Sequence, residues 1–361
     1  MSLINRLFIR IKTRLFLKAS FLFVVSLFSL TFLVSCNQNA SPPFFLLTGQ
    51  TMGTSYNITV VSPPDNVDKY ELQINIDKLL IAINQQMSTY IADSEISKLN
   101  QSPVNTWQRI SSDFFTVLEL SQYISALTNG RFDITIGPLV DLWGFGAGSE
   151  KDQKIPDSDM LEITRSKVGW KNLVLDKENS SIKKLKPIRI DLSAIAKGYG
   201  VDKVSELLSS KKMDHYLVEI GGEVKVKGFN KENKLWRLGI EVPSLLQKSV
   251  QRVVQLSDQA IATSGDYRNY FEENGVRFSH TIDPVSSTPV KHNIASVSII
   301  ADTAAKADAF ATALNVLGEK AALELSDREN IAAYFILYDN ENSDIKYRVV
   351  HSKAFIPFLN N

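Results

Sequence analysis

The sequence is poor in the residues and motifs on which several common protein classes depend. The 361-residue chain has one cysteine and four histidines. One cysteine excludes an intramolecular disulfide framework and a cysteine-rich zinc site. No strand-like segment leads into a Gly-x-Gly-x-x-Gly turn, and the pattern Gly-x-x-x-x-Gly-Lys-Ser/Thr does not occur. The sequence therefore predicts neither a Rossmann dinucleotide site nor a P-loop.

The chain also lacks a large surplus of charge of either sign. It is 44% hydrophobic and 22% charged, with 17 glycines and 12 prolines, which excludes collagen-like, coiled-coil and mainly disordered chains. The net charge is +1, but the first 35 residues hold five basic side chains and no acidic one. Without them, 35 Lys and Arg stand against 39 Asp and Glu, a net charge of −4. Nucleic acid needs concentrated positive charge, so we expect no nucleic-acid partner.

The N-terminus has the pattern of a secretory signal. A basic segment within residues 1–18 precedes an uncharged run at residues 19–35 that is rich in Phe, Leu and Val. The run is borderline in length for a membrane-spanning helix, which needs about 20 residues. Residues 33–36, Leu-Val-Ser-Cys, resemble a bacterial lipobox, in which Cys36 becomes the lipidated first residue of the mature protein. The alternative is a signal anchor with an incidental cysteine.

We therefore predict a lipoprotein signal peptide at residues 1–35, a lipidated cysteine and linker at 36–48, and a folded region at 49–361. The folded region is one large domain or two lobes. A lipid on Cys36 would anchor the mature protein to a membrane of the cell envelope, facing the periplasm or the outside. It would also remove the only free thiol, which suits an oxidising compartment. Asn37, directly after the cysteine, slightly favours the outer membrane.

Hydrophobic periodicity alternates between strand-like and helix-like segments along the folded region. Period-two alternation predicts strands at residues 55–61, 173–176, 215–226, 238–242, 251–256 and 294–300. Helical periodicity predicts helices at residues 68–89, 111–128, 197–209 and 303–317. Gly221-Gly222 lies between two apolar alternations and predicts a tight hairpin turn. Hairpin-paired strands interleaved with helices indicate an α+β fold, not a doubly wound parallel sheet.

Two glycine-containing segments are candidates for contact with a ligand. Residues 51–54, Thr-Met-Gly-Thr, precede a strand and are, by themselves, a turn with a flexible glycine. In residues 130–146, Gly and Pro punctuate a short apolar strand, and Trp143 and Phe145 lie among glycines. Such a loop brings backbone close to a flat heteroaromatic ring, or else its two aromatic side chains plug the core. The residues alone leave both interpretations open.

A third candidate is the small-residue segment at 191–200. Residues 189–191 end a predicted strand, and a helix is expected to start near Ala194. The free N–H groups of that helix start, with Lys197 in its first turn, favour a phosphate. In the simpler interpretation, Asp191 or Ser193 caps the helix. The two interpretations are compatible, because a cap and an anion site use the same donors.

The alanine-rich helix at 303–317 carries a candidate metal site. Asp302, just before it, is a natural N-cap. Asp308 and Thr312 are four residues apart, so their oxygens fall on one helix face. Two hard oxygens one turn apart suit Mg²⁺, which takes its other ligands from phosphates and water. A side-chain hydrogen bond between the two residues would use the same spacing.

Among the four histidines, His280 is the best placed to act as a base. It begins the turn-rich segment 280–284, His-Thr-Ile-Asp-Pro, shortly after residues 264–267, a loop expected to bring backbone close to a ligand. An imidazole titrates near neutrality and accepts the proton of a hydroxyl nucleophile. The alternative is a histidine that caps a turn beside Pro284.

In this order the segments resemble one protein family. The lipobox is followed by TMGT, MSTY, FDITIGPLVDLWGFG, IDLSAIAKGYGVD, ATSGDYR, HTIDP and DTAAKADAFATAL, spread over residues 49–317. This ordered set is similar to the FAD:protein FMN transferases of the ApbE family, once called thiamine-biosynthesis lipoproteins. The resemblance implies an α+β fold with mixed or antiparallel sheets flanked by helices. It also implies transfer of FMN from FAD to a threonine hydroxyl of an acceptor protein, through a phosphoester bond and with release of AMP.

The resemblance also implies roles for individual positions. The residues that match FAD-contacting positions are Met52, Tyr90, Arg131, Phe132, Asp133, Asp191, Lys197 and Ile282. The lysine at 197 is an acid in some members, so its contact with FAD need not be the same in all of them. Mg²⁺ ligands are implied at the Ala194 carbonyl and at the side chains of Asp308 and Thr312. Ala311 departs from members with a further acidic residue and receives no metal role, and His280 matches the general base.

The family's acceptors are subunits of envelope redox complexes, such as the sodium-pumping NADH:quinone oxidoreductase and Rnf-type complexes. A lipid-anchored enzyme outside the cytoplasm would meet them. Two other functions suit the same motifs: a Mg²⁺-dependent FAD pyrophosphatase that gives FMN and AMP, and a non-catalytic FAD-binding lipoprotein. A tyrosine at position 90 would cover the flavin and favour transfer over hydrolysis. Asp308, Thr312 and His280 argue against storage, because storage needs no base.

Overall fold

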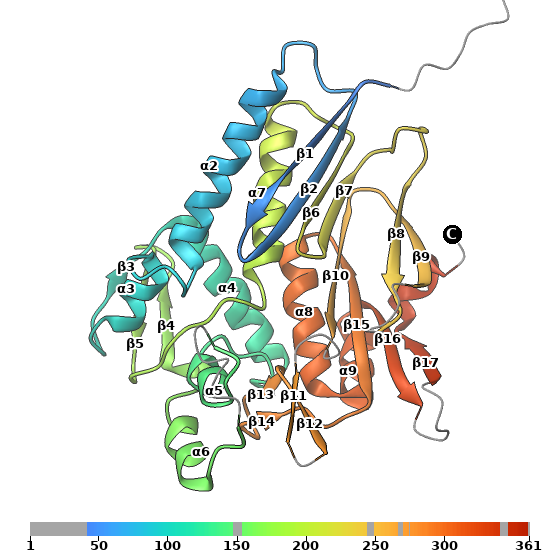
Figure 1. The fold of residues 1–361 in the computed structure, drawn as a ribbon. Coiled ribbons are helices and arrows are strands. Elements are labelled where there is room, and N and C mark those ends of the chain that lie inside the picture. Colours follow the sequence, from blue (N-terminus) through green and yellow to red (C-terminus); the bar gives the residue numbers. More distant parts are fainter. Residues whose placement is uncertain are drawn as a thin grey trace, which may run out of the picture. The chain divides into compact units, whose positions relative to one another are not determined.

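The structure is a computed structural model that describes residues 42–146, 154–243, 249–265, 270–273, 275–339 and 346–359 (Figure 1). Residues Pro43–Asn361 form one compact unit. The predicted signal peptide, Cys36 and most of the predicted linker lie outside the described residues. Within the described residues, no helix is both long and apolar enough to cross a membrane.

The framework of the unit is an eight-stranded sheet in which every neighbouring pair of strands is antiparallel. From one edge to the other, its strands are β1 (Phe44–Thr51), β2 (Thr54–Val61), β6 (Tyr216–Ile220), β7 (Glu223–Lys227), β10 (Gln259–Gly265), β15 (Ile294–Ala301), β16 (Ala332–Asp339) and β17 (Lys346–His351). Residues 294–300 of β15 are all buried, as expected for an apolar strand that is covered on both faces.

Smaller sheets surround this framework and are also antiparallel. Their strands are β3 (Gln108–Arg109), β4 (Leu173–Asp176), β5 (Ser181–Lys184), β8 (Trp236–Glu241), β9 (Val250–Leu256), β11 (Tyr270–Glu273), β12 (Val276–Ser279), β13 (Ile282–Asp283) and β14 (Thr288–Pro289). Among the described residues, the only parallel pairing is an isolated bridge between Ile136 and Arg189. The α+β prediction with antiparallel sheets, and without a Rossmann sheet, is confirmed.

Some of the helices cover one face of the main sheet, and a hairpin with a short helix covers the other. The helices are α2 (Lys69–Met87), α3 (Glu95–Gln101), α4 (Ser112–Leu127), α5 (Gly137–Leu142), α6 (Ser158–Arg165), α7 (Ala196–Ser210), α8 (Ala304–Leu317) and α9 (Glu319–Arg328), with the short helices η2 (Trp170–Asn172) and η3 (Lys353–Phe358). In Figure 1, α2 and α7 lie beside β1, β2 and β6, and they share one buried core with those strands. On the opposite face, the β8–β9 hairpin and η3 pack through Trp236, Val254 and Phe355.

The helices and strands predicted from periodicity are confirmed, with their ends displaced by no more than two residues. The predicted linker is the first exception, because residues 44–48 belong to β1. Each residue of β1 pairs with β2, beginning with Phe44 opposite Val61, and this ladder holds the segment in the sheet. The glycine pair 221–222 forms the turn between β6 and β7, as predicted.

The short strand predicted within residues 130–146 does not form. The carboxylate of Asp133 accepts hydrogen bonds from the Thr135 N–H at 2.8 Å and the Thr135 hydroxyl at 2.7 Å, and these contacts stabilise a turn. Within the described part of this segment, the β-pairing is limited to an isolated bridge between Ile136 and Arg189. The strand predicted to end at residues 189–191 is reduced to the same bridge.

The predicted helix caps are also wrong. The N-cap of α8 is Thr303, whose hydroxyl oxygen accepts from the Lys306 N–H, whereas Asp302 pairs with the Lys306 ammonium at 2.9 Å. Helix α7 begins at Ala196 and has no side-chain cap at its own N-terminus. Asp191 instead accepts from the Ser193 N–H at 2.8 Å, in a turn that precedes the helix.

Candidate active site

The N-terminal turns of α7 and α8 approach each other very closely. A Cβ atom at Gly198 would lie 2.3 Å from the carbonyl oxygen of Ala304, so the approach requires glycine. Gly198 lies in the first turn of α7, where N–H groups have no acceptor within the helix, and its N–H donates to Oδ2 of Asp308 at 3.0 Å. Asp308 is buried, and this hydrogen bond fixes its carboxylate against the first turn of α7.

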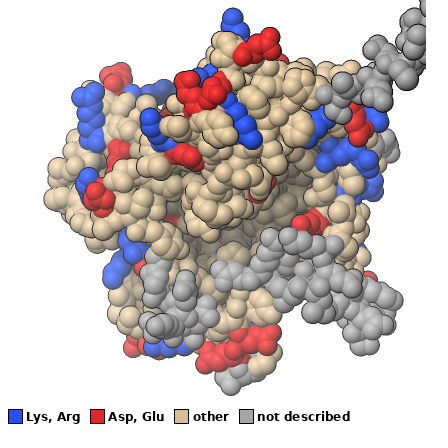
Figure 2. All heavy atoms as spheres, turned by 45° about the horizontal axis from the view of Figure 1, so that its top comes forward, with Lys and Arg blue, Asp and Glu red and all other residues tan. Residues whose placement is uncertain are grey.

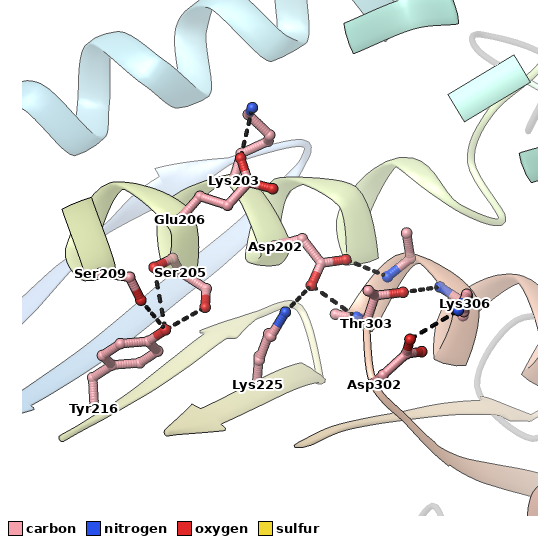
Figure 3. Close-up of polar contacts among 12 residues, drawn as sticks. Asp202, Lys203, Ser205, Glu206, Ser209, Tyr216, Lys225, Asp302, Thr303 and Lys306 are labelled. Atoms are coloured by element: carbon pink, nitrogen blue, oxygen red, sulfur yellow. Dashed lines mark hydrogen bonds and ion pairs between the residues drawn. The ribbon is translucent and has the colours of Figure 1, made fainter. Parts of the chain in front are cut away.

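Asp202 of α7 joins both helices to the sheet (Figure 3). Its Oδ1 accepts from the Ala304 N–H at 3.0 Å, and its Oδ2 accepts from the Ala305 N–H at 2.9 Å. Oδ1 also pairs with Nζ of Lys225, on β7, at 2.8 Å. A carboxylate at a helix N-terminus satisfies free N–H groups and interacts well with the helix dipole. The role of Asp202 has no signal in the sequence, because no local pattern marks a cap that comes from another helix.

Lys197 lies between two buried carboxyl groups. Its Nζ is 3.3 Å from Oε1 of Glu223, the first residue of β7, and 3.7 Å from Oδ2 of Asp308. Burial disfavours the ammonium, but the negative charges of Asp308 and Glu223 outweigh burial and raise the pKa of Lys197 above its ordinary value. Burial, reinforced by the charge of Asp308, raises the pKa of Glu223 well above its usual range. Glu223 also lacks a motif that would mark it as part of the site, and its only local signal in the sequence is the glycine turn before it.

The oxygens around Asp308 suit a hard divalent cation. The Ala194 carbonyl lies two residues before the start of α7 and accepts no hydrogen bond within the described contacts. Thr312 follows Asp308 by one turn of α8 and is half-buried. Carboxylate, hydroxyl and carbonyl oxygens are ligands that Mg²⁺ prefers. Among the described residues, no cluster of three or more His, Cys, Asp or Glu side chains could hold a metal ion.

The turn between β1 and β2 lies beside these groups. Met52 occupies this turn with φ of 49°, and its methyl carbon is 3.0 Å from the position of a Cβ at Gly200. Gly221 has φ of +59°, and a Cβ there would lie 2.8 Å from Thr54 and 3.3 Å from Cδ of Lys197. Met52 and Lys197, both predicted FAD contacts, are thus brought to one place by two glycine-containing turns and α7.

A second set of predicted residues gathers around the loop at 131–136. Arg131 forms an ion pair with Asp283, the neighbour of Ile282. The side chains of Phe132 and Ile282 are buried, so their contacts with a ligand would involve backbone atoms. The Asp191 N–H donates to the Ile134 carbonyl at 2.7 Å, which brings Asp191 to the same loop.

The carboxylate of Asp133 accepts hydrogen bonds from this loop and from Trp170. In addition to its bonds with Thr135, its Oδ2 accepts from the Trp170 N–H at 2.8 Å. Burial raises the pKa of Asp133, and these hydrogen bonds oppose that effect. Asp133 therefore shapes the loop with its carboxylate, and its role towards FAD stays a prediction.

His280 lies at the end of an aromatic cluster. The cluster, in order of ring contact, consists of Trp143, Phe278, Phe271, Phe145 and His280. The centroids of the Phe145 and His280 rings are 6.3 Å apart, with the planes at 70°. Trp143 is buried, and its Nε1–H donates to the Ser287 carbonyl at 3.0 Å. Of the two interpretations of the glycine-rich segment, Trp143 therefore fits the one in which an aromatic side chain plugs the core.

Tyr90 and the ATSGDYR segment, both predicted parts of the site, have fewer described contacts than the residues above. Tyr90 follows α2 and is 72% exposed, and its N–H donates to the Ser88 hydroxyl at 3.3 Å. The ATSGDYR segment follows β10 to Gly265, and its last three residues lie outside the described residues. Figure 2 shows that one face of the molecule is hollowed near its centre and that most of the visible wall is uncharged.

Residues 52–335 match the model of the ApbE family. The chain belongs to the ApbE family. An FAD:protein FMN transferase of Vibrio cholerae serotype O1 is 40% identical over 336 residues, which covers 93% of this chain and 98% of that protein. An FAD:protein FMN transferase of Haemophilus influenzae is 41% identical over 297 residues, covering 81% of this chain and 86% of that protein.

Solved ApbE structures have the same architecture. The flavin transferase ApbE from Vibrio cholerae superposes with a TM-score of 0.79 at 38% identity, covering 88% of this chain and 100% of that chain. The apo form of the Pseudomonas stutzeri flavinyl transferase ApbE gives a TM-score of 0.80 at 32% identity, covering 89% of this chain and 98% of that chain. The predicted family is therefore confirmed, together with its fold.

Proposed function

We propose that this ApbE-family protein is a Mg²⁺-dependent FAD:protein FMN transferase. The observation that carries the proposal is the Lys197 ammonium beside the Asp308 carboxylate, which the Gly198 N–H holds where α7 and α8 approach each other. The ammonium of Lys197 could pair with a pyrophosphate, and the carboxylate oxygens of Asp308 are ligands that suit the Mg²⁺ bound to it. Curated relatives 36–41% identical to this chain are named FAD:protein FMN transferases, which supports the same chemistry here.

In the proposed reaction, a threonine Oγ of the acceptor protein forms a bond to the FMN phosphorus of FAD. The bond from that phosphorus to the bridging pyrophosphate oxygen breaks, and AMP leaves with the electron pair. The hydroxyl proton passes to the imidazole of His280, which acts as general base. The product is FMN joined to threonine by a phosphoester.

The remaining residues bind and orient FAD. The Ala194 carbonyl, Asp308 and Thr312 would hold Mg²⁺, which when bound offsets the charge of the phosphates and of the leaving group. Lys197 would contact the pyrophosphate through its ammonium. Met52 in the β1–β2 turn, the loop at 131–133 and Tyr90 would contact the rest of the dinucleotide.

We also propose that the enzyme works outside the cytoplasm on a lipid anchor. The basic and apolar segments at residues 1–35 and the lipobox ending at Cys36 support this location, with the outer membrane slightly favoured over the inner one. Subunits of the sodium-pumping NADH:quinone oxidoreductase or of Rnf-type complexes are the proposed acceptors. An envelope location would bring such subunits within reach of the enzyme.

Chromatography of the nucleotide products tests the proposed reaction. The mature protein is incubated with FAD and Mg²⁺, with and without a threonine-bearing acceptor protein. We expect AMP to appear only with the acceptor and in step with acceptor-bound flavin, without free FMN. AMP and free FMN in equal amounts without the acceptor would identify a pyrophosphatase, and FAD that stays intact with its acceptor would identify a binding protein. Either result would overturn the proposal.

A further inference from the structure

Glu223 is a buried carboxyl group with only part of its hydrogen-bonding capacity used. Its side chain is 6% exposed at the start of β7, directly after the glycine turn. Oε1 faces Nζ of Lys197 at 3.3 Å, whereas Oε2 is buried with no hydrogen-bond partner in the described part of the chain. A buried polar oxygen without a partner is costly, so its retention at this point needs a reason.

The Lys197 ammonium lies within ion-pair distance of two carboxyl groups. Its Nζ is nearer to Glu223, at 3.3 Å, than to Asp308, at 3.7 Å. Asp308 already accepts a hydrogen bond from the Gly198 N–H on the same oxygen, Oδ2. The lysine stem passes over Gly221, where a Cβ would lie 3.3 Å from Cδ, so the glycine turn leaves room for this path. The ammonium is thus held between the two carboxyl groups and closer to Glu223.

An ammonium beside Asp308 competes with a metal cation for the same carboxylate. Two positive charges a few ångströms apart in a poorly solvated site repel each other strongly. A second acceptor for the ammonium relieves this repulsion, because the lysine keeps an ion pair when the cation takes Asp308. Glu223 is the only carboxyl group besides Asp308 that pairs with Lys197 among the described ion pairs.

We propose that Glu223 is a positioning residue that holds the Lys197 ammonium away from Asp308 and so leaves Asp308 available to Mg²⁺. This inference rests on the proposed function, because it assumes that Asp308 binds the cation. It assigns no metal contact to Glu223. Glu223 acts through Lys197, and removal of Lys197 should make Glu223 unimportant for metal binding.

Isothermal titration of Mg²⁺ into the metal-free mature protein, without FAD, tests this inference by a double-mutant cycle. We expect Glu223→Gln to weaken Mg²⁺ binding about tenfold when Lys197 is present, which corresponds to about 1.4 kcal/mol. In the K197M background, the same change should alter the affinity by no more than about twofold. K197M alone should bind Mg²⁺ at least as tightly as the wild type.

The matched control is Glu219→Gln, at the end of β6. Glu219 accepts from the Asn57 amide at 2.7 Å and from the Gly222 N–H at 2.7 Å, so it belongs to the same hairpin but is remote from the Lys197 ion pair. This variant should bind Mg²⁺ as the wild type does. If it weakens Mg²⁺ binding as much as Glu223→Gln, general disturbance of the hairpin explains the effect and the inference is overturned.

Other results also decide against the inference. An equal loss from Glu223→Gln with and without Lys197 would mean that Glu223 acts on the cation directly. No loss in either background would mean that it has no role in metal binding. If Glu223→Gln does not fold, K197M alone decides, because weaker Mg²⁺ binding by K197M contradicts competition at Asp308. Absence of Mg²⁺ binding by the wild type would instead refute the proposed metal site.

Discussion

The two halves of the candidate site are built from different interactions. At the crossing of α7 and α8, buried charged groups hold the structure: Lys197 with Glu223 and Asp308, and Asp202 with Lys225. Around His280, ring packing dominates, with Phe271 and Phe278 stacked at 5.1 Å between their centroids. A buried charge is expensive unless every partner is in place, whereas an aromatic cluster tolerates small changes of shape. We therefore expect substitutions in the charged half to have the larger effects.

The largest expected effect is that of Asp308→Ala. This variant loses the carboxylate proposed to bind Mg²⁺ and leaves the Lys197 ammonium with Glu223 alone. We expect FMN transfer to fall by about a hundredfold to a thousandfold, as when a charged group that stabilises a transition state is removed. The measurement is the initial rate of acceptor flavinylation at saturating FAD.

Asp302→Ala is the matched control for that experiment. Asp302 precedes the same helix, but its side chain is 69% exposed and pairs with Lys306. Surface ion pairs of this kind contribute little, so its transfer rate should remain within about twofold of the wild type. Equal losses in Asp302→Ala and Asp308→Ala would show that the start of α8, and not the carboxylate of Asp308, matters.

His280→Ala should have the second-largest effect. Loss of a general base lowers the rate by about a hundredfold or more. FAD binding should be retained, because the proposed metal and pyrophosphate groups lie in the other half of the site. Equilibrium dialysis with FAD, combined with the transfer rate, separates the two effects. A normal transfer rate in His280→Ala, alongside a normal rate in the control His351→Ala on β17, would contradict the assignment of His280 as the base.

Asp202→Asn tests the charged half through stability. The neutral amide cannot accept from both Ala304 and Ala305 N–H groups as the carboxylate does, and Lys225 loses its buried ion pair. We expect the free energy of unfolding to fall by about 2 kcal/mol, within the range for losing a helix cap and a buried charged hydrogen bond. Denaturant unfolding measures it.

Asp214→Asn provides the comparison for Asp202→Asn. Asp214 also pairs with a β7 lysine, Lys227, at 2.8 Å, but its side chain is 67% exposed. Exposed ion pairs contribute about 0–1 kcal/mol, so this variant should be nearly as stable as the wild type. Similar losses in the two variants would mean that burial of Asp202 adds nothing to its effect.

The smallest expected effect is that of Trp143→Phe in the aromatic half. The change keeps a ring in the core but removes the Nε1–H that donates to the Ser287 carbonyl. We expect a loss of about 1 kcal/mol of stability with the transfer rate unchanged. Trp107→Phe is the control, since Trp107 is 45% exposed and should change stability by less than about 0.5 kcal/mol. A larger loss of activity than of stability in Trp143→Phe would show that the cluster contributes to the chemistry.

Periodicity along the sequence predicted the elements whose pattern is local. Helix α8 repeats small and apolar residues at helical spacing, and its ends could be placed within one residue. In contrast, residues 44–48 of β1 are predicted to be linker, because their place in the strand depends on pairing with β2 and not on their own composition. The prediction of a short strand within residues 130–146 is wrong for a similar reason, since the hydrogen bonds of Asp133 reach Trp170, far along the chain.

The candidate site could be predicted only where a motif carries it. Asp308 and Thr312 have helical spacing, and local patterns also mark Lys197 in a first helical turn and His280 in a turn-rich segment. The resemblance to the ApbE family added Met52 as an FAD contact. Glu223 belongs to none of the motifs, and Asp202 ends one of them without a local signal for its role. Each acts on a residue that folding brings from another element. Ion pairs between elements depend on packing of the whole sheet and its helices, which the sequence pattern does not contain.

The most direct test of the central claim is the intact mass of an acceptor protein. The acceptor is incubated with the mature enzyme, FAD and Mg²⁺, next to a copy in which the target threonine is replaced by valine. We predict a mass gain equal to FMN less one water on the threonine-bearing acceptor only, and its loss in EDTA. An unchanged acceptor mass, with AMP and free FMN in solution, would contradict the assignment of this protein as an FMN transferase.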